Sequence, residues 1–444
     1  MRTDTYLYRK QLKNIPMDWK KEGNFVTVEE AVKAIKDNDN IVFGHAAGVP
    51  GVVPLEMVKQ MDRLHNVKIF HMFTINNGEY LTPETEGHFR HVTNFVGGNS
   101  RAAVAEDRGD FYPLHFSDVP SFFDRYFPVD VTVAQVSLPD ENGNCSFGIS
   151  CDYTLPAARR SKIIIAEMNE NMPYIPGDNF MHISQFTYIV ENHNPIAVLP
   201  PAKITDIEKQ IGHFCSTLIK DGDTLQLGIG AIPDAVLMSL DDKHDLGIHT
   251  EMFSSGVVDL AKKGVITGAK KSLLPGKMVA TFLMGTKELY EFANNNPNVE
   301  MRTVDWVNDP RVIAQNDNMV SINSCIEVDL TGQVNSETIG LKQFSGTGGQ
   351  FDYVKGASWS KGGRSIMAMP STAAHGKASR IVPFLSQGAA VTTPRDDVDY
   401  VVTEYGIAHL KGASLKERAK RLIAIAHPDF RPMLEEEYKK RFKN

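Results

Sequence analysis

The sequence predicts an α/β protein made of two similar, open and mostly parallel domains. Residues 35–44 (IKDNDNIVFG) recur as residues 219–228 (IKDGDTLQLG), at an offset of 184 positions, and small residues with a proline follow both copies. Apolar runs of strand length alternate with helical or turn-rich stretches, which is typical of a doubly wound parallel sheet. A proline-rich segment between the copies indicates a linker. Together these observations predict a duplicated α/β fold.

The first half contains the elements expected of one such domain. Residues 1–25 are polar and predict an N-terminal extension or a surface helix. Thr27 and Glu30 have the spacing of a capping box, in which each side chain satisfies a backbone N–H at a helix start. An amphipathic helix through residues 32–35 should follow. Strands are expected at residues 41–43, 67–70, 131–136 and 163–166.

The second half repeats this order after the linker. Residues 192–201 contain three prolines, which oppose a helix or a central strand. We therefore predict an N-terminal domain over residues 1–200 and a C-terminal domain over residues 201–444. Residues 415–442 are charged with helical spacing and should pack on the outside. The other expected elements are helices around residues 211–219 and from Asp234, and strands at residues 225–227, 246–249, 320–322 and 366–369.

Composition and charge disfavour several classes of function. The formal net charge of −7 argues against nucleic acid as the main partner, because phosphate neutralisation needs clustered Lys and Arg. No apolar run approaches the roughly 20 residues that span a bilayer. The N-terminus lacks the basic and then apolar layout of a secretory signal. We expect a cytoplasmic protein without a nucleic-acid or membrane partner.

The cysteines and histidines show no metal-binding pattern. The four cysteines lack C-x-x-C spacing, so we interpret them as packing residues in a reducing compartment. His45, His71 and His249 stand at the ends of expected strands, but no H-E-x-x-H or other ligand spacing accompanies them. We interpret them as structural histidines and expect no metal site.

Two glycine-rich segments could hold a ligand through the backbone. Residues 228–234 (GIGAIPD) lie between an expected strand and helix, where exposed N–H groups attract phosphate or another anion. A tight turn needed only for packing is the alternative. Residues 344–352 (FSGTGGQFD) could form a nest or an oxyanion hole, with a flexible turn as the alternative. Neither segment matches a Walker loop or a G-x-G-x-x-G fingerprint.

Glu251 is the strongest candidate for chemistry. It follows an apolar run in the second half, and the carboxyl ends of strands line the ligand crevice of open α/β sheets. Met72 occupies the aligned position in the first half. Packing alone would favour methionine over a charge that must be desolvated. A solvated loop acid is the alternative.

Three further polar residues, Asn308, Glu327 and Asp329, stand in recognisable local patterns. Asn308 lies in a pre-proline loop, where it could orient a carboxylate or cap its own backbone. Residues 321–330 alternate like a strand, which puts Glu327 and Asp329 on one face. We predict that this is a solvent or interface face and that the two acids are no catalytic pair.

Four segments in fixed order carry a resemblance to a known family. They are residues 225–233 (LQLGIGAIP), 247–252 (GIHTEM), 344–350 (FSGTGGQ) and 401–408 (VVTEYGIA). In them the chain resembles the acyl-CoA:carboxylate CoA-transferases of the acetyl-CoA hydrolase/transferase group, and within it the 4-hydroxybutyrate and butyrate CoA-transferases. The likeness extends from residue 29 to residue 430, and residues 1–25 are the least covered.

The resemblance implies roles for residues of this chain. It implies that Glu251 is the nucleophile, which forms a covalent glutamyl-CoA thioester, and that Asn308 positions its carboxylate. CoA would be a co-substrate, with no permanently bound cofactor. The two glycine-rich loops would hold CoA and the thioester oxyanion. The residues expected to bind CoA are Gln226, Leu227, Gly228, Ile229, Gly230, Ala231, Asn323, Gly346, Gly348 and Gly349.

The implied reaction moves CoA between butyryl-CoA or 4-hydroxybutyryl-CoA and acetate by ping-pong kinetics. The expected partners are acyl-CoA, small carboxylates and further copies of the chain in a dimer or larger homo-oligomer. A short-chain acyl-CoA thioesterase on the same scaffold is the nearest alternative. A non-enzymatic CoA or nucleotide sensor is a second one. A Rossmann dehydrogenase is disfavoured, since no acidic ribose partner follows a proper fingerprint.

Overall fold

The computed structural model describes residues 19–75 and 78–442. Most of the predicted N-terminal extension therefore lies outside the described residues, and its described end forms helix α2 (Trp19–Glu22). Helix α3 (Val28–Val32) begins as the sequence predicts, because the Thr27 side chain accepts a hydrogen bond from the backbone N–H of Glu30. This bond satisfies one of the N–H groups left free at a helix start.

The N-terminal half is an open sheet of seven parallel strands in the order β4-β3-β2-β1-β5-β7-β9. Its strands are β1 (Asn40–Phe43), β2 (Val67–Phe70), β3 (Phe89–Thr93), β4 (Gly109–Phe111), β5 (Val131–Val136), β7 (Ile163–Asn169) and β9 (Tyr188–Asn192). The helices of this half are α3, α4 (Val53–Lys59), α5 (Arg101–Ala105), α6 (Val119–Arg125) and α7 (Thr154–Ala158), and a hairpin pairs β6 (Asn144–Ser146) with β8 (Phe180–His182).

The C-terminal half is an eight-stranded sheet in the order β15-β13-β11-β10-β16-β21-β25-β26, in which only β26 runs antiparallel. Its strands are β10 (Thr224–Leu227), β11 (Gly247–His249), β13 (Met278–Ala280), β15 (Val299–Met301), β16 (Met319–Ser324), β21 (Arg364–Ala368), β25 (Tyr400–Thr403) and β26 (Gly406–His409). Its helices are α8 (Asp206–Thr217), α9 (Ala231–Met238), α10 (Ser255–Lys262), α11 (Lys287–Ala293), α12 (Val304–Val307), α13 (Pro310–Ile313), α14 (Gln350–Trp359), α15 (Leu415–Ala424) and α16 (Arg431–Phe442).

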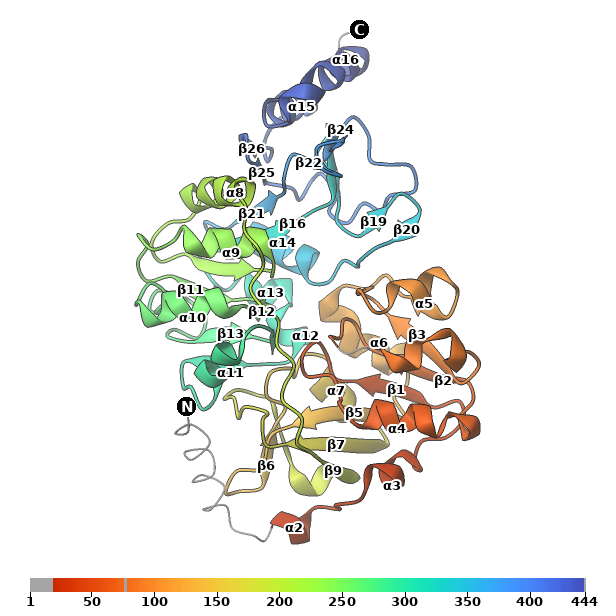
Figure 1. Ribbon diagram of the computed structural model, residues 1–444. Coiled ribbons are helices and arrows are strands. Elements are labelled where there is room, and N and C mark those ends of the chain that lie inside the picture. The colour runs from red at the N-terminus through yellow and green to blue at the C-terminus, as the bar shows by residue number, and fades with distance from the viewer. Residues whose placement is uncertain (1–18, 76–77, 443–444) are drawn as a thin grey trace.

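The second half also contains short strands that lie outside its main sheet. They pair as β12 with β14, β17 with β18 and β24, β19 with β20, and β22 with β23. Their bounds are β12 (Met252–Phe253), β14 (Phe282–Leu283), β17 (Glu327–Asp329), β18 (Val334–Asn335), β19 (Thr338–Ile339), β20 (Lys342–Gln343), β22 (Thr372–Ala373), β23 (Ala378–Ser379) and β24 (Ile381–Val382). Figure 1 shows the two halves stacked along the long axis of the molecule, with α15 and α16 at the far end.

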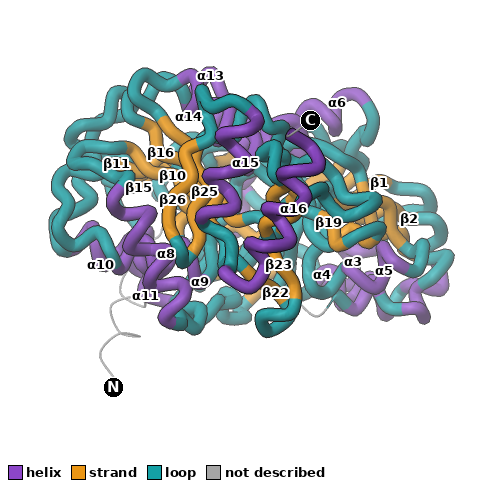
Figure 2. The backbone as a smooth tube through the Cα atoms, turned by 90° about the horizontal axis from the view of Figure 1, so that it is seen from above, coloured by secondary structure: helices purple, strands orange, loops and turns teal. Residues whose placement is uncertain are grey.

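The fold class predicted from the sequence is confirmed. The strands expected from the apolar runs are all present, and residues 193–201 form no helix or strand, as their prolines predict. Two details differ. The helix expected from Asp234 begins earlier, at Ala231, because Gly230 caps it with a positive φ of 112° and Pro233 fits the first turn without needing its N–H. The C-terminal helical stretch is two helices, α15 and α16, which pack against each other (Figure 2).

Equivalent strands of the two sheets pair in the same register. Ile41 in β1 pairs with Ile69 in β2, and its repeat equivalent Leu225 in β10 pairs with Ile248 in β11. Three residues beyond these partners stand Met72 and Glu251. The structure therefore places the methionine and the glutamate at equivalent positions in the two halves, as the repeat predicts.

Of the two predicted settings for Glu327 and Asp329, a solvent face or an interface face, the solvent face is wrong. The strand breaks after Ser324, and β17 joins a separate small sheet in which both acids are buried. Glu327 accepts hydrogen bonds from the backbone N–H and hydroxyl of Ser386 at 3.0 and 2.8 Å. Asp329 accepts one from the Thr331 hydroxyl at 2.7 Å. These bonds replace the hydrogen bonds that the two carboxylates would otherwise make to water. The alternation of apolar and polar residues in this segment therefore does not indicate an exposed face.

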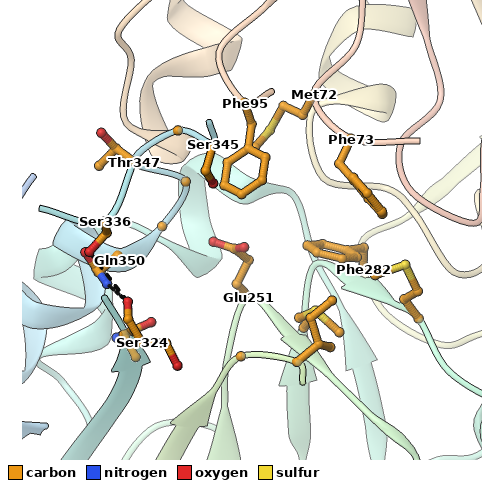
Figure 3. A pocket seen from close by; sticks show the side chains of 18 of the residues that line it. Met72, Phe73, Phe95, Glu251, Phe282, Ser324, Ser336, Ser345, Thr347 and Gln350 are labelled. Carbon is orange, nitrogen blue, oxygen red and sulfur yellow. Dashed lines mark hydrogen bonds between the residues drawn. The ribbon is translucent and has the colours of Figure 1, made fainter. Parts of the chain in front are cut away.

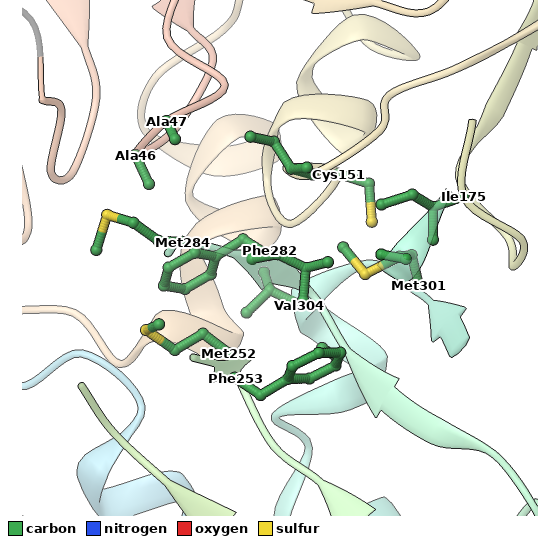
Figure 4. Packing of buried hydrophobic residues seen from close by; sticks show 14 of the residues in the cluster. Ala46, Ala47, Cys151, Ile175, Met252, Phe253, Phe282, Met284, Met301 and Val304 are labelled. Atoms are coloured by element: carbon green, nitrogen blue, oxygen red, sulfur yellow. The ribbon is translucent and has the colours of Figure 1, made fainter. Parts of the chain in front are cut away.

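One hydrophobic core continues through both halves. Ala46 and Cys151 of the first half and Phe282 and Met301 of the second belong to the same cluster (Figure 4). Backbone pairing crosses the boundary too, since Gly177 bridges Met301. The four cysteines are buried free thiols, as expected of packing residues. Every helix among the described residues is too short or too polar to cross a membrane.

Candidate active site

A cavity of about 280 Å³ lies between the two halves, where β10 and β11 end. The first half lines it with His45, Met72, Phe73 and Phe95. The second half contributes residues 226–229, Glu251, the apolar Met252, Phe282 and Met284, three polar residues (Asn323, Ser324 and Ser336), and residues 345–350. Figure 3 shows Glu251 between the Phe95 and Ser345 side and the Phe282 side of this space. The position agrees with the rule that strand carboxyl ends line the crevice.

The backbone of Glu251 is held in place by the segment at residues 281–282. The residue stands between β11 and β12, and its carbonyl oxygen accepts hydrogen bonds from the N–H groups of Thr281 and Phe282 at 3.0 and 3.1 Å. Its side chain is half-buried and reaches the cavity. One carboxylate oxygen, Oε2, accepts a hydrogen bond from Asn308 Nδ2 at 3.0 Å. Asn308 is fully buried at the end of α12, so this donor is fixed in position.

Burial raises the pKa of Glu251 to about 7. Removal of water disfavours the charged carboxylate. The Asn308 amide, the charge of His45 and the N–H of Gly349 favour the charged form, whereas nearby Asp152 opposes it. A carboxyl group with this pKa is ionised in part at neutral pH and is poorly solvated, which suits a nucleophile.

The backbone of the glycine-rich loop at residues 344–350 lies against the Glu251 side chain. A Cβ atom at Gly349 would overlap Glu251 Oε2 and Asn308 Nδ2, so a larger residue would have to displace the carboxylate, the amide or the loop. The loop is held by the first half of the chain. The Val96 N–H donates to the Ser345 carbonyl at 3.2 Å, and the Phe116 N–H donates to the Gly348 carbonyl at 3.0 Å. Gly346 in turn lies against the Asn94 carbonyl.

The other predicted residues divide into two groups. Gln226, Leu227, Gly228, Ile229 and Asn323 line the cavity with Glu251. The amides of Gln226 and Asn323 bond each other at 3.0 and 3.2 Å. The structure does not bring Gly230 or Ala231 to this cavity. Gly230 lines a neighbouring cavity together with Asp234, and Ala231 begins helix α9.

Sequence reasoning did not predict that residues of the first half line the cavity. It treated His45 as a structural histidine, yet His45 lines the cavity. A signal was available, because His45 is the repeat equivalent of Ile229, which lies in a predicted ligand loop. By contrast, His249 is buried and its Nε2 lies 2.9 Å from the Val307 carbonyl, and burial lowers its pKa to about 3. His71 is buried 2.9 Å from the Tyr80 hydroxyl, so both fit a structural role.

Comparison with known families and proteins identifies relatives along the length of the chain. The family model described as acetyl-CoA hydrolase/transferase N-terminal domain matches residues 9–200. The one described as acetyl-CoA hydrolase/transferase C-terminal domain matches residues 285–438. Together these matches cover more than half of the chain, on both sides of the cavity.

Individual relatives match over almost their entire length. A 4-hydroxybutyrate coenzyme A transferase of Clostridium kluyveri is 56% identical over 96% of this chain and 100% of its own. A butyryl-CoA:acetate CoA-transferase of Anaerostipes caccae is 38% identical over 92% of this chain and 94% of its own. The crystal structure of a 4-hydroxybutyrate CoA-transferase from Porphyromonas gingivalis has a TM-score of 0.84 and 47% identity, covering 96% of this chain and 100% of that one.

Proposed function

This chain belongs to the acetyl-CoA hydrolase/transferase family, and on that premise we propose that it transfers CoA between 4-hydroxybutyryl-CoA and acetate through a glutamyl-CoA thioester on Glu251. Its class, a short-chain acyl-CoA:carboxylate CoA-transferase, follows from relatives that match from end to end. The acyl preference is inferred from identity, which is 56% to the 4-hydroxybutyrate enzyme and 38% to the butyryl-CoA enzyme.

One observation carries the assignment of Glu251. It is the carboxylate that lines the cavity between the halves, with the Asn308 amide on one oxygen and the Gly349 backbone beside it. The repeat places methionine at the equivalent position of the other half, where no nucleophile is needed. A carboxylate in a mostly apolar cavity can act as a nucleophile towards an acyl group, and acyl exchange through an anhydride is one reaction of this kind.

The proposed mechanism has two similar half-reactions. The Glu251 carboxylate attacks the thioester carbonyl, which forms a mixed anhydride and releases CoA as thiolate. The thiolate then attacks the glutamyl carbonyl, so that CoA is bound to Glu251 and the first acid departs. Acetate attacks this thioester and the steps run in reverse. Each addition develops an oxyanion, and we propose that backbone N–H groups of the loop at residues 346–349 stabilise it. The Phe95, Phe282 and Met284 side chains limit water, which would hydrolyse both intermediates.

Two measurements test this function against the thioesterase alternative. Transfer of CoA from 4-hydroxybutyryl-CoA should depend on acetate, and little free CoA should form when acetate is absent. Incubation with acyl-CoA followed by borohydride reduction should modify the peptide that contains Glu251. Release of CoA that is independent of acetate would favour the thioesterase. Modification at Glu327 or Glu404 would overturn the assignment of the nucleophile.

The pH dependence should report the raised pKa of Glu251. We expect kcat/KM for acyl-CoA to rise with pH up to about 7 and then level off, because the protonated carboxyl cannot attack. In an Asn308→Ala variant the inflection should move to higher pH, since the lost amide favours the ionised form. Initial rates between about pH 5.5 and pH 8.5 would show this. A flat profile over this range, which an inflection near the ordinary glutamate value of 4.5 would give, would contradict the burial argument.

Two sequence-based expectations remain proposals. We propose a homo-oligomer, which gel filtration with light scattering would test. We also propose a boundary between the domains near residues 200 and 201, where the irregular segment after β9 leads into α8.

A further inference from the structure

The cavity must accept a carboxylate, yet its lining contains almost no positive charge. No lysine or arginine lines it among the residues that the structure describes. His45 is the one lining side chain of this set that can become a cation. An anion placed in a largely apolar space without a counter-charge would lose its hydration at high cost.

The setting of His45 orients one ring nitrogen and leaves the other available. His45 Nδ1 lies 3.0 Å from Asp152 Oδ2. Asp152 is fully buried and accepts further hydrogen bonds from the Ser150 hydroxyl at 2.9 Å and the Tyr153 N–H at 2.6 Å. A proton on Nδ1 is donated to this carboxylate, which leaves Nε2 as the ring nitrogen that can donate to a second carboxylate when the ring is an imidazolium.

The ring is also fixed against the cavity wall. Its centroid lies 4.5 Å from that of Phe282, which lines the cavity with Glu251. The rings of Phe116 and Tyr153 pack against it at 5.6 and 5.4 Å. His45 is only 2% exposed, so its position is set by packing and by Asp152 rather than by solvent.

We propose that His45, oriented by Asp152, binds the carboxylate of the acceptor acid through Nε2–H. This inference rests on the proposed function and adds the recognition of the acid substrate to it. When Glu251 is a free carboxylate, the charge of His45 favours its ionised form. Once Glu251 is a neutral thioester, the negative charge of the site resides on the incoming acid, which takes over as the charge partner of His45.

The proton on His45 stays in place during the exchange. A carboxylate oxygen of the acid attacks the glutamyl carbonyl carbon, a C–O bond forms, the C–S bond breaks, and the electron pair leaves on the CoA sulfur. The thiolate then attacks the acyl carbonyl of the anhydride and releases the Glu251 carboxylate. No proton is consumed in either step, so the role of His45 is binding and charge compensation.

The His45→Asn variant tests this role. Asparagine retains an amide that can reach Asp152 but cannot carry the positive charge. We expect the KM for acetate to rise about 10- to 100-fold, because the free energy of one charge-assisted hydrogen bond corresponds to a factor of this size. The KM for acyl-CoA should change less than about threefold. The exposed His213 on α8 provides a matched control, since His213→Gln should leave both constants unchanged.

The split between the two KM values separates recognition of the acid from a structural role. A general loss of structure in His45→Asn would raise both constants, whereas loss of the charge partner should raise the KM for acetate alone.

The outcomes are distinguishable from a failure of the proposed function. If the Glu251 adduct forms normally in His45→Asn while the KM for acetate is unchanged, the inference about His45 is wrong and the proposed function stands. If the unchanged protein forms no adduct, the proposed function itself fails. Adduct formation in the variant also shows that it is folded.

Discussion

Replacement of Glu251 by glutamine is expected to lower the rate of CoA transfer by at least about 10³-fold, because the variant keeps the shape of the side chain and loses the nucleophile. Glutamine can still contact Asn308, so the cavity should remain intact. The KM for acyl-CoA, if measurable, should change little. Intact-mass measurement after incubation with acyl-CoA should show no CoA-sized adduct, in contrast to the unchanged protein.

A carboxylate outside the cavity serves as the control. Glu404 lies in the same half and accepts hydrogen bonds from the N–H and hydroxyl of Ser371 at 2.8 and 2.5 Å. Glu404→Gln should keep its activity within about threefold, since it removes a charge without touching the site. Turnover by Glu251→Gln close to that of the unchanged protein would refute the covalent mechanism.

Replacement of Gly349 by alanine should have the second largest effect, a loss of about 10²- to 10³-fold in kcat. The added methyl group would occupy the space of Glu251 Oε2 and Asn308 Nδ2. Either the carboxylate or the loop must move, and both changes misplace groups that act in the transition state. The pH inflection should shift as well, because the Gly349 N–H helps to keep Glu251 ionised.

Gly98→Ala is the matched control for this substitution. A Cβ atom at Gly98 meets no atom within 4 Å, so the same change of residue type should leave kcat unaltered. Thermal unfolding of both variants would show whether lost activity reflects lost stability. Gly349→Ala with normal kcat would mean that the loop does not hold Glu251 in the reactive geometry.

Much of the fold could be predicted because the chain repeats itself. The copy of residues 35–44 at 219–228 implies two equivalent strands, and the observed register confirms the alignment of Met72 with Glu251. The glycine-rich composition of residues 344–352 predicts a loop that could hold a ligand, whereas the close approach of Gly349 to Glu251 and Asn308 depends on the tertiary structure.

Other features depend on contacts between segments far apart in the sequence. His45 and Asp152 are separated by 107 positions, and no local pattern joins them. The burial of Glu327 likewise comes from Ser386, which lies 59 positions away. Spacing rules describe neighbours along one helix or strand, so they cannot reveal partners brought together by packing of different elements.

The amino-acid sequence alone determined the duplicated α/β fold, the family and the position of Glu251 opposite Met72 in the repeat, because these are recorded in repeats, in periodicity and in short ordered segments. Only the tertiary structure decided which residues surround that glutamate. His45 and Phe95 of the first half line the same cavity as Glu251 of the second half. The physical reason is that desolvation and charge pairing act through space, so the properties of Glu251 arise from burial between two sheets and not from its neighbours in the chain.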